Sequence, residues 1–318
     1  MRLLRRGTAL LLLCLVLLPL LCGCALTGKE HSEIVCTVYP LYDWTLAVLG
    51  DYAERYPVLL LSDNGNDPHN YQPTVREIAA VKDAALFLSV GGVSDAWAEE
   101  IAKPTGKWLT LLDAVELCGM DHEHHDHEHG DGHTHDEIDE HFWLSLGNAK
   151  RAVLAITEAL SEVYADDAEA VAAFRKNAEA YTERLDTLDG RYRAAVAEAA
   201  RDTVLVADRF PYLYLFSDYG IRSHAAFPGC SAETEASFAT VVSLAKTLEE
   251  LRLTTVLITE TGTRDLADTV IAAAGRSDVS VLVLHSCQSV SLKERESGIS
   301  YLSIMEENLA VLSAALAP

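Results

Sequence analysis

One long stripe of apolar residues constrains the fold of this 318-residue chain more than any other feature. Its members follow one another at alternating steps of four and three: Phe174, Ala178, Tyr181, Leu185, Leu188, Tyr192 and Ala195. This spacing is one face of an amphipathic α-helix, and the segment contains no proline. A helix over residues 170–198 would be roughly 44 Å long, enough to span two domains and join them stiffly. The alternative is two ordinary helices broken near Gly190.

Short β-rich segments alternate with helical ones on both sides of this stripe. Before it, we expect strands at 34–38, 56–61 and 85–90 and helices at 41–49, 74–82 and 94–102, with Thr74 and Glu77 as a capping box. After it, we expect strands at 203–207, 255–259 and 279–284 and helices at 212–219, 233–251, 264–274 and 301–316. The alternation predicts the α/β fold class, with two lobes built on central parallel sheets and joined by the long helix.

The start of the chain has the features of a targeting segment. Three arginines precede a nearly continuous apolar run over residues 8–21, which ends at Leu21-Cys22-Gly23-Cys24. This ending resembles the bacterial lipobox, which implies cleavage after Gly23 and a diacylglycerol on Cys24. The alternative is an uncleaved membrane anchor. The predicted organisation is therefore a signal peptide (1–23), an amino-terminal lobe (24–168), the linking helix (169–199) and a carboxy-terminal lobe (200–318), in an extracytoplasmic, lipid-anchored and monomeric protein.

Charge narrows the choice of partner. The formal net charge is −23, which argues against nucleic acid and anionic lipid as partners and is compatible with cations. Seven histidines crowd between His122 and His135, among acids, glycines and one threonine. No core can form there, so residues 121–136 are expected to be a mobile loop that collects transition metal. The alternative is a solvated acidic linker.

Several donor side chains follow predicted strands, where parallel α/β sheets bind ligands, and His141 instead stands against the apolar run Phe142-Trp143-Leu144, which would hold a ligand in place. The candidate metal ligands are His69, His141, Asp208, Glu260 and His285, with His224 as a weaker one. Each has a structural alternative, such as a histidine packed on Trp143 or an aspartate paired with Arg209. Two or three imidazoles with a carboxylate suit Zn²⁺, and more carboxylate would favour Mn²⁺.

Two motifs resemble those of the solute-binding proteins of zinc and manganese ABC importers, the ZnuA-like family. Residues 67–74 are similar to Asp-Pro-His-x-Tyr-Glu-Pro-Thr, with Gln72 in place of Glu, and residues 139–144 are similar to Asp-Pro-His-x-Trp-Leu, with Glu140 in place of Pro. The histidine-rich segment is typical of the zinc members, and residues 301–309 resemble the closing helix. The resemblance covers nearly the whole mature chain. It implies a metal bound in the cleft between two lobes and delivered to a permease and an ATPase on separate chains.

The second half departs from the family pattern. The zinc members place a third histidine where this chain has Ala207, and Asp208 is the nearest donor. The family's fourth position is an Asp at the end of the last strand, where His285 falls. The resemblance thus implies zinc as the transported ligand, with manganese possible, and leaves the third and fourth ligands open.

Two other classes of function compete with a receptor. A zinc hydrolase would need an open coordination position and a general base, but the chain contains neither His-Glu-x-x-His nor Gly-x-Ser-x-Gly, so we expect no enzyme. A metal buffer or adhesion lipoprotein would use only the histidine-rich segment. The pairing of Cys36, Cys118, Cys230 and Cys287 is left open by their spacing.

Overall fold

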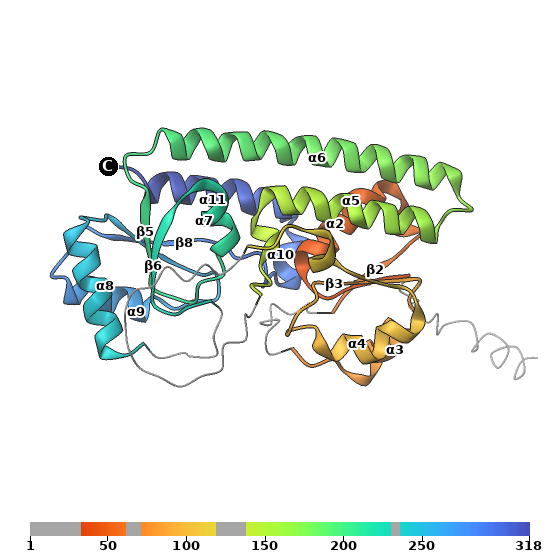
Figure 1. Ribbon diagram of the computed structural model, residues 1–318, viewed down its shortest axis with the longest axis horizontal. Coiled ribbons are helices and arrows are strands. Elements are labelled where there is room, and N and C mark those ends of the chain that lie inside the picture. The colour runs from red at the N-terminus through yellow and green to blue at the C-terminus, as the bar shows by residue number, and fades with distance from the viewer. Residues whose placement is uncertain (1–32, 62–70, 119–137, 230–235) are drawn as a thin grey trace, which may run out of the picture.

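The computed structural model describes residues 33–61, 71–118, 138–229 and 236–318. Two four-stranded parallel sheets, in the orders β2-β1-β3-β4 and β6-β5-β7-β8, form two lobes that lie side by side beneath one long helix (Figure 1). The predicted α/β class with two lobes is confirmed. The predicted signal peptide, Cys24, His69, segment 121–136 and Cys230 lie outside the described residues.

The amino-terminal lobe has helices on both faces of its sheet. Its strands are β1 (Ile34–Cys36), β2 (Val58–Leu60), β3 (Leu86–Ser89) and β4 (Trp108–Thr110). Helices α3 (Val75–Asp83) and α4 (Ala96–Ala102) pack on one face, and α2 (Tyr39–Leu49) and α5 (Leu146–Val163) on the other. The predicted capping box is present, since Thr74 accepts from the backbone of Glu77 and Glu77 from that of Thr74. Strand β4 was not anticipated from the sequence.

The carboxy-terminal lobe repeats this plan. Its strands are β5 (Thr203–Val206), β6 (Arg222–Ala225), β7 (Thr255–Ile258) and β8 (Ser280–Val283). Its helices are α7 (Leu213–Tyr219), α8 (Phe238–Glu250), α9 (Arg264–Ala273), α10 (Leu292–Glu296) and α11 (Tyr301–Ala315). Helices α8 and α9 enclose a core of their own with one face of the sheet, and α7 and α11 pack on the other face. Strand β6 and helix α10 were not anticipated.

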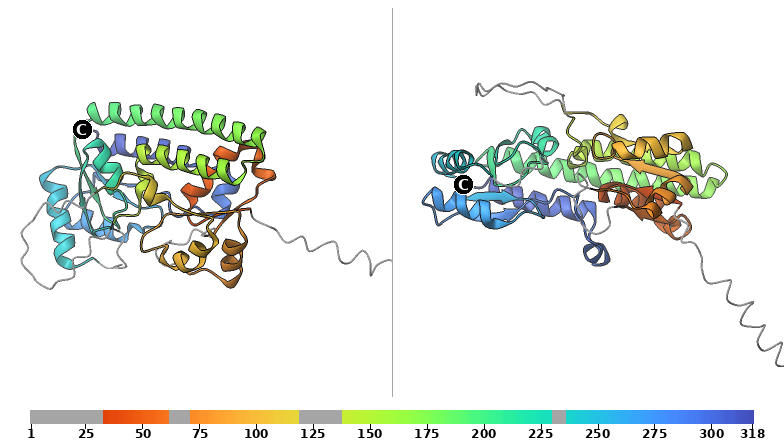
Figure 2. Two further views of the ribbon diagram at one scale, coloured as in Figure 1. Left: turned by 45° about the vertical axis from the view of Figure 1, so that its right-hand side comes forward. Right: turned by 90° about the horizontal axis from the view of Figure 1, so that it is seen from below.

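Helix α6 (Ala168–Ala197) is a single helix of 30 residues and extends along both lobes (Figure 2). Its buried residues include six of the seven members of the predicted stripe. The helix continues through Gly190, so the alternative of two helices broken near this residue is wrong. The main apolar core contains residues of both lobes, such as Trp44 and Tyr212, packed with Phe174 and Tyr192 of α6. The lobes are therefore continuous parts of one packed body.

Asp43 joins three helices. Its carboxylate accepts hydrogen bonds from the hydroxyls of Tyr39 at 3.2 Å and Tyr181 at 3.4 Å, and from the backbone nitrogen of Tyr301 at 3.1 Å. Burial raises the pKa of Asp43, against the lowering effect of these bonds. The carboxylate thus ties α2, α6 and the first turn of α11 together.

Two further features concern the described part of the chain. None of its helices has both the length and the apolar character needed to cross a membrane. Cys36, Cys118 and Cys287 carry free thiols.

Candidate metal centre

His141 lies where the amino-terminal lobe meets the carboxy-terminal lobe. The one-turn helix that follows it, Phe142–Leu144, is buried in full, and this apolar wall fixes the backbone of the histidine. Trp143 packs edge-on against the imidazole with ring centroids 5.2 Å apart. His141 itself is only 3% exposed, so its ring nitrogens must find partners within the protein.

Asp139 sets the tautomer of His141. Its Oδ1 lies 2.8 Å from the ring Nδ1 and 2.8 Å from the backbone nitrogen of the histidine. A carboxylate accepts, so Nδ1 carries the proton of the neutral ring and Nε2 carries a lone pair. This arrangement orients a metal-ligating histidine and raises its basicity.

Nε2 of His141 faces Gln288, which belongs to the other lobe. The side-chain oxygen of Gln288 lies 3.1 Å from Nε2, and Gln288 is 4% exposed. Two tetrahedral ligands held about 2.0–2.1 Å from one Zn²⁺ lie roughly 3.3 Å apart. The pair is therefore spaced to share one ion. Gln288 was not among the predicted ligands, and the only signal in its favour was its place in the loop that follows a strand.

Hydrogen bonds from the carboxy-terminal lobe hold the motif around His141. The indole Nε1 of Trp143 donates to the carbonyl of Ser286 at 2.8 Å, and the hydroxyl of Tyr214 donates to the carbonyl of Asp139 at 3.0 Å. The hydroxyl of Tyr301, at the start of α11, donates to the carbonyl of Trp143 at 2.5 Å. The position of His141 therefore depends on both lobes.

His285 lies at the end of β8, as predicted, but its ring has local partners. Nδ1 accepts from the backbone nitrogen of Cys287 at 2.9 Å and lies 3.6 Å from Glu260, while Nε2 is buried with no hydrogen-bond partner among the described residues. Cys287 has a φ of +62°, a left-handed conformation that is uncommon outside glycine. This residue turns the chain between His285 and Gln288.

Asp208 and Glu260 lie at the same sheet edge, because β5, β7 and β8 are parallel neighbours. Oδ2 of Asp208 accepts from the backbone nitrogen and the hydroxyl of Thr259 at 2.9 and 2.8 Å. The carboxylate of Glu260 accepts from the backbone nitrogen and the hydroxyl of Ser286 at 2.8 and 2.6 Å. The two carboxylates thus hold the loops that follow β7 and β8. A metal ion bound by either carboxylate would compete with these hydrogen bonds.

The other candidates are placed as follows. Ala207 is buried at the end of β5 and offers no side-chain donor. His224 is exposed on β6, the edge strand of its sheet. His69 lies outside the described residues. Within the ranges that the structure describes, no three side chains of the His, Cys, Asp and Glu types come together as a metal site.

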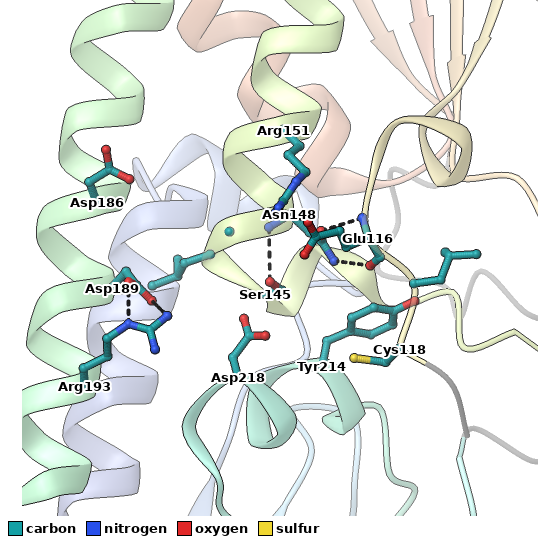
Figure 3. Close-up of a pocket in the computed structure, with 13 residues that line it drawn as sticks. Glu116, Cys118, Ser145, Asn148, Arg151, Asp186, Asp189, Arg193, Tyr214 and Asp218 are labelled. Atoms are coloured by element: carbon teal, nitrogen blue, oxygen red, sulfur yellow. Dashed lines mark hydrogen bonds and ion pairs between the residues drawn. The ribbon is translucent and has the colours of Figure 1, made fainter. Parts of the chain in front are cut away.

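A polar pocket of about 330 Å³ lies beside the centre but contains none of the predicted ligands (Figure 3). Four of its charged groups form two ion pairs, Arg193 with Asp189 at 2.8 Å and Arg151 with Glu116. The thiol of Cys118 lines it, with a pKa raised by burial. Tyr214 lines the pocket, and its hydroxyl donates to the carbonyl of Asp139. This residue therefore connects the pocket to the segment that carries His141.

Two α/β lobes bridged by one long helix, with an oriented and buried imidazole between them, define a class of binding proteins that hold a small ligand between their lobes. Within this class, the chain belongs to the ZnuA family, described as zinc-uptake complex component A, periplasmic, whose model matches residues 34–315.

Relatives with known names agree with this membership. The zinc-binding lipoprotein AdcA of Streptococcus pneumoniae is 32% identical over 315 residues, which cover 93% of this chain and 60% of AdcA. The chain thus spans less than two thirds of that relative's length. The high-affinity zinc uptake system protein ZnuA of Bacillus subtilis is 27% identical over 299 residues, which cover 92% of this chain and 90% of that protein.

Solved structures match over similar spans. The Zn(II)-bound ZnuA-like domain of Streptococcus pneumoniae AdcA has a TM-score of 0.72 at 27% identity, and the match covers 90% of this chain and 98% of that one. The metal-dependent lipoprotein YcdH of Bacillus subtilis has a TM-score of 0.73 at 25% identity, with 90% and 99% covered.

Proposed function

We propose that this chain is an extracytoplasmic receptor that captures Zn²⁺ between its lobes and delivers it to an ABC importer. The observation that carries the proposal is the alignment of Asp139, His141 and Gln288, which directs a ring nitrogen of one lobe at an oxygen of the other. Zinc is favoured over manganese because nitrogen ligands suit Zn²⁺, and because AdcA and ZnuA are named for zinc. The permease and the ATPase would be separate chains.

The ligands that we propose are His69, His141 and Gln288. His285, Asp208 and Glu260 stay predictions, since the carboxylates of Asp208 and Glu260 and Nδ1 of His285 already accept hydrogen bonds from described residues. Cys24 would carry the lipid that tethers the protein to the membrane surface. Manganese is the alternative ion, and we expect the chain to be monomeric and to catalyse no reaction.

Release of the ion would follow from the division of the ligands between lobes. His141 belongs to the amino-terminal lobe and Gln288 to the loop after β8 in the other lobe. Any separation of the lobes would therefore move these two ligands apart, so that they could no longer bind the same ion. The bonds of Trp143 and Tyr214 must stretch in the same movement. A permease that binds both lobes could therefore weaken zinc binding by parting them.

The test is the Zn²⁺ affinity of purified protein, measured by competition with a chelator. His69→Ala and His141→Ala should each lower the Zn²⁺ affinity of the tight site at least about tenfold, because each change removes one imidazole ligand of the ion. His224→Ala is the matched control, since His224 is exposed on an edge strand. Wild-type affinity in the His141 variant would refute the proposed site.

A further inference from the structure

Glu140 lies between Asp139 and His141 in the chain and is only 7% exposed. Hydrogen bonds tie both of its neighbours to the other lobe: the carbonyl of Asp139 accepts from Tyr214, and the ring of His141 contacts Gln288. The side chain of Glu140 binds the amino-terminal lobe instead. Its role concerns how His141 is held as a ligand, so the inference rests on the proposed function.

The partner of Glu140 is the loop of residues 90–95, which follows β3. Oε1 of Glu140 accepts a hydrogen bond from the backbone nitrogen of Ser94 at 2.9 Å. Gly91 and Gly92 in this loop have φ values of +91° and +84°. A Cβ on Gly92 would lie 2.5 Å from Oε1 of Glu140 and 2.9 Å from its Cδ. The carboxylate therefore lies directly against the backbone, at a position that requires glycine.

The loop itself is firmly held to the sheet. Oδ2 of Asp95 accepts from the backbone nitrogens of Val90 at 2.7 Å and Gly91 at 3.2 Å. The same oxygen accepts from the hydroxyl of Thr37, the residue after β1, at 3.1 Å. The carbonyl of Val90 accepts from the backbone nitrogen of Leu112 at 2.9 Å. A side chain that binds this loop is thus fixed relative to the sheet of the amino-terminal lobe.

Glu140 stands where the similar motif of the ZnuA-like family has proline. A proline ring fixes φ of its own residue and restricts the conformation of the residue before it. Glutamate places neither restraint on the backbone. The contact with Ser94 and Gly92 restrains the same point of the chain through the side chain instead.

We infer that Glu140 is a positioning residue for His141. Its carboxylate ties segment 139–141 to the amino-terminal lobe, so that the imidazole keeps its direction and stays with this lobe when the lobes part. Glu140 acts through the hydrogen bond from Ser94, and neither as a ligand nor through its charge. Outer partners that orient a metal-ligating histidine contribute roughly 10–100-fold to metal affinity.

The first test is the Zn²⁺ affinity of the full-length protein, measured by chelator competition. Glu140→Ala should lower the affinity about tenfold or more, whereas Glu140→Gln should stay within about threefold of wild type, because an amide oxygen can accept from Ser94. Glu100→Ala, on the exposed face of α4, controls for the loss of one carboxylate. Equal losses in the alanine and glutamine variants would show that charge decides, and would overturn the inference.

Gly92→Ala perturbs the same contact from the other side. It should lower the affinity about tenfold in the wild-type background but less than about twofold when residue 140 is already alanine, because the two changes break one contact. Gly106→Ala is the matched control, since Gly106 also has a positive φ of +67° but its Cβ would meet no atom within 4 Å. Independent, multiplicative losses from the Gly92 and Glu140 changes would overturn the inference.

A measurement without metal follows the histidine directly. The Nδ1 proton of His141, identified in NMR spectra by its loss in His141→Ala, should exchange with solvent about tenfold faster in Glu140→Ala than in wild type or Glu140→Gln. Urea denaturation of the metal-free proteins checks that each variant is folded. Unchanged exchange in folded Glu140→Ala would overturn the inference.

The outcomes separate this inference from the proposed function. Tight Zn²⁺ binding that His141→Ala abolishes but Glu140→Ala leaves unchanged would overturn the inference and leave the receptor intact. Absence of tight binding in the wild-type protein would overturn the proposed function, while the exchange of the Nδ1 proton would still show whether Glu140 holds His141 in place.

Discussion

The carboxylate of Asp139 holds both the ring and the backbone of His141, at 2.8 Å in each case. One acidic side chain thus sets the tautomer of the histidine and the angle at which it faces the other lobe. The carbonyl of Asp139 is in turn held by Tyr214 from that lobe. The orientation of the candidate ligand is therefore a property of the closed pair of lobes.

Asp139→Asn should lower the affinity for Zn²⁺ about 10–100-fold, because an amide neither fixes the tautomer of His141 nor raises the basicity of its ring. Asp186→Asn, on the exposed face of α6, is the control. The measurement is chelator competition beside a thermal denaturation curve. Unchanged affinity in a folded variant would show that Asp139 does not position a ligand.

Trp143→Phe should destabilise the protein more than Trp44→Phe, by about 1–2 kcal/mol. Both indoles are fully buried, but Nε1 of Trp143 donates to the carbonyl of Ser286, whereas Nε1 of Trp44 has no hydrogen-bond partner among the described residues. Removing one donor leaves a buried acceptor unsatisfied, which adds to the cost of lost volume. Urea denaturation gives both free energies of unfolding. Equal losses would mean that the bond between the lobes contributes nothing.

Asp95 should make stability depend on pH. Burial raises its pKa from 3.8 to about 6, so protonation favours the folded state. This contribution is complete below the unfolded pKa and is lost as the pH rises through about 6. All three hydrogen bonds, from Thr37, Val90 and Gly91, reach one oxygen, which the amide of Asp95→Asn can replace.

Relative to Asp95→Asn, the wild-type free energy of unfolding should fall by up to about 3 kcal/mol between about pH 4 and pH 7. Parallel curves of stability against pH for the two proteins would contradict this assignment. Asp83→Asn, at the end of α3, controls for the loss of one carboxylate.

Gly190→Ala should stabilise the protein by about 0.5–1 kcal/mol, because Gly190 lies inside the continuous α6 and an added Cβ meets no atom within 4 Å. Gly50→Ala is the opposite case. Gly50 has a φ of +54°, and its Cβ would lie 2.6 Å from the amide nitrogen of Asn177, which binds the carbonyl of Val48. Thermal denaturation should shift upward for the first variant and downward for the second. A loss of stability in Gly190→Ala would argue against a straight helix at that point.

Deleting residues 121–136 should remove weak zinc equivalents and keep one tight site. Ligands close in sequence but without fixed geometry must order the chain on each binding event, which limits their affinity. Titration of intact and shortened protein distinguishes the receptor from a metal buffer. Loss of all tight binding on deletion would favour the buffer.

The sequence by itself determined the plan of the molecule. The stripe from Phe174 to Tyr192 predicted a single helix, because period and length are local properties that survive folding. The apolar strands and the capping box at Thr74 were readable for the same reason. Strands β4 and β6 and helix α10 were missed, since their short sequences, Trp-Leu-Thr, Arg-Ser-His-Ala and Leu-Lys-Glu-Arg-Glu, contain too few apolar residues to show a periodicity.

The tertiary structure alone decided which side chains meet across the lobes. Asp139 and His141 are two residues apart, so their pairing is local, but Gln288 reaches His141 over 147 positions. That contact depends on the left-handed turn at Cys287 and on the bonds that hold Trp143 to the loop after β8. The physical reason is that a ligand set is assembled from strand-end loops of two sheets, and the relative placement of two sheets is set by packing over the whole core, which no local pattern records.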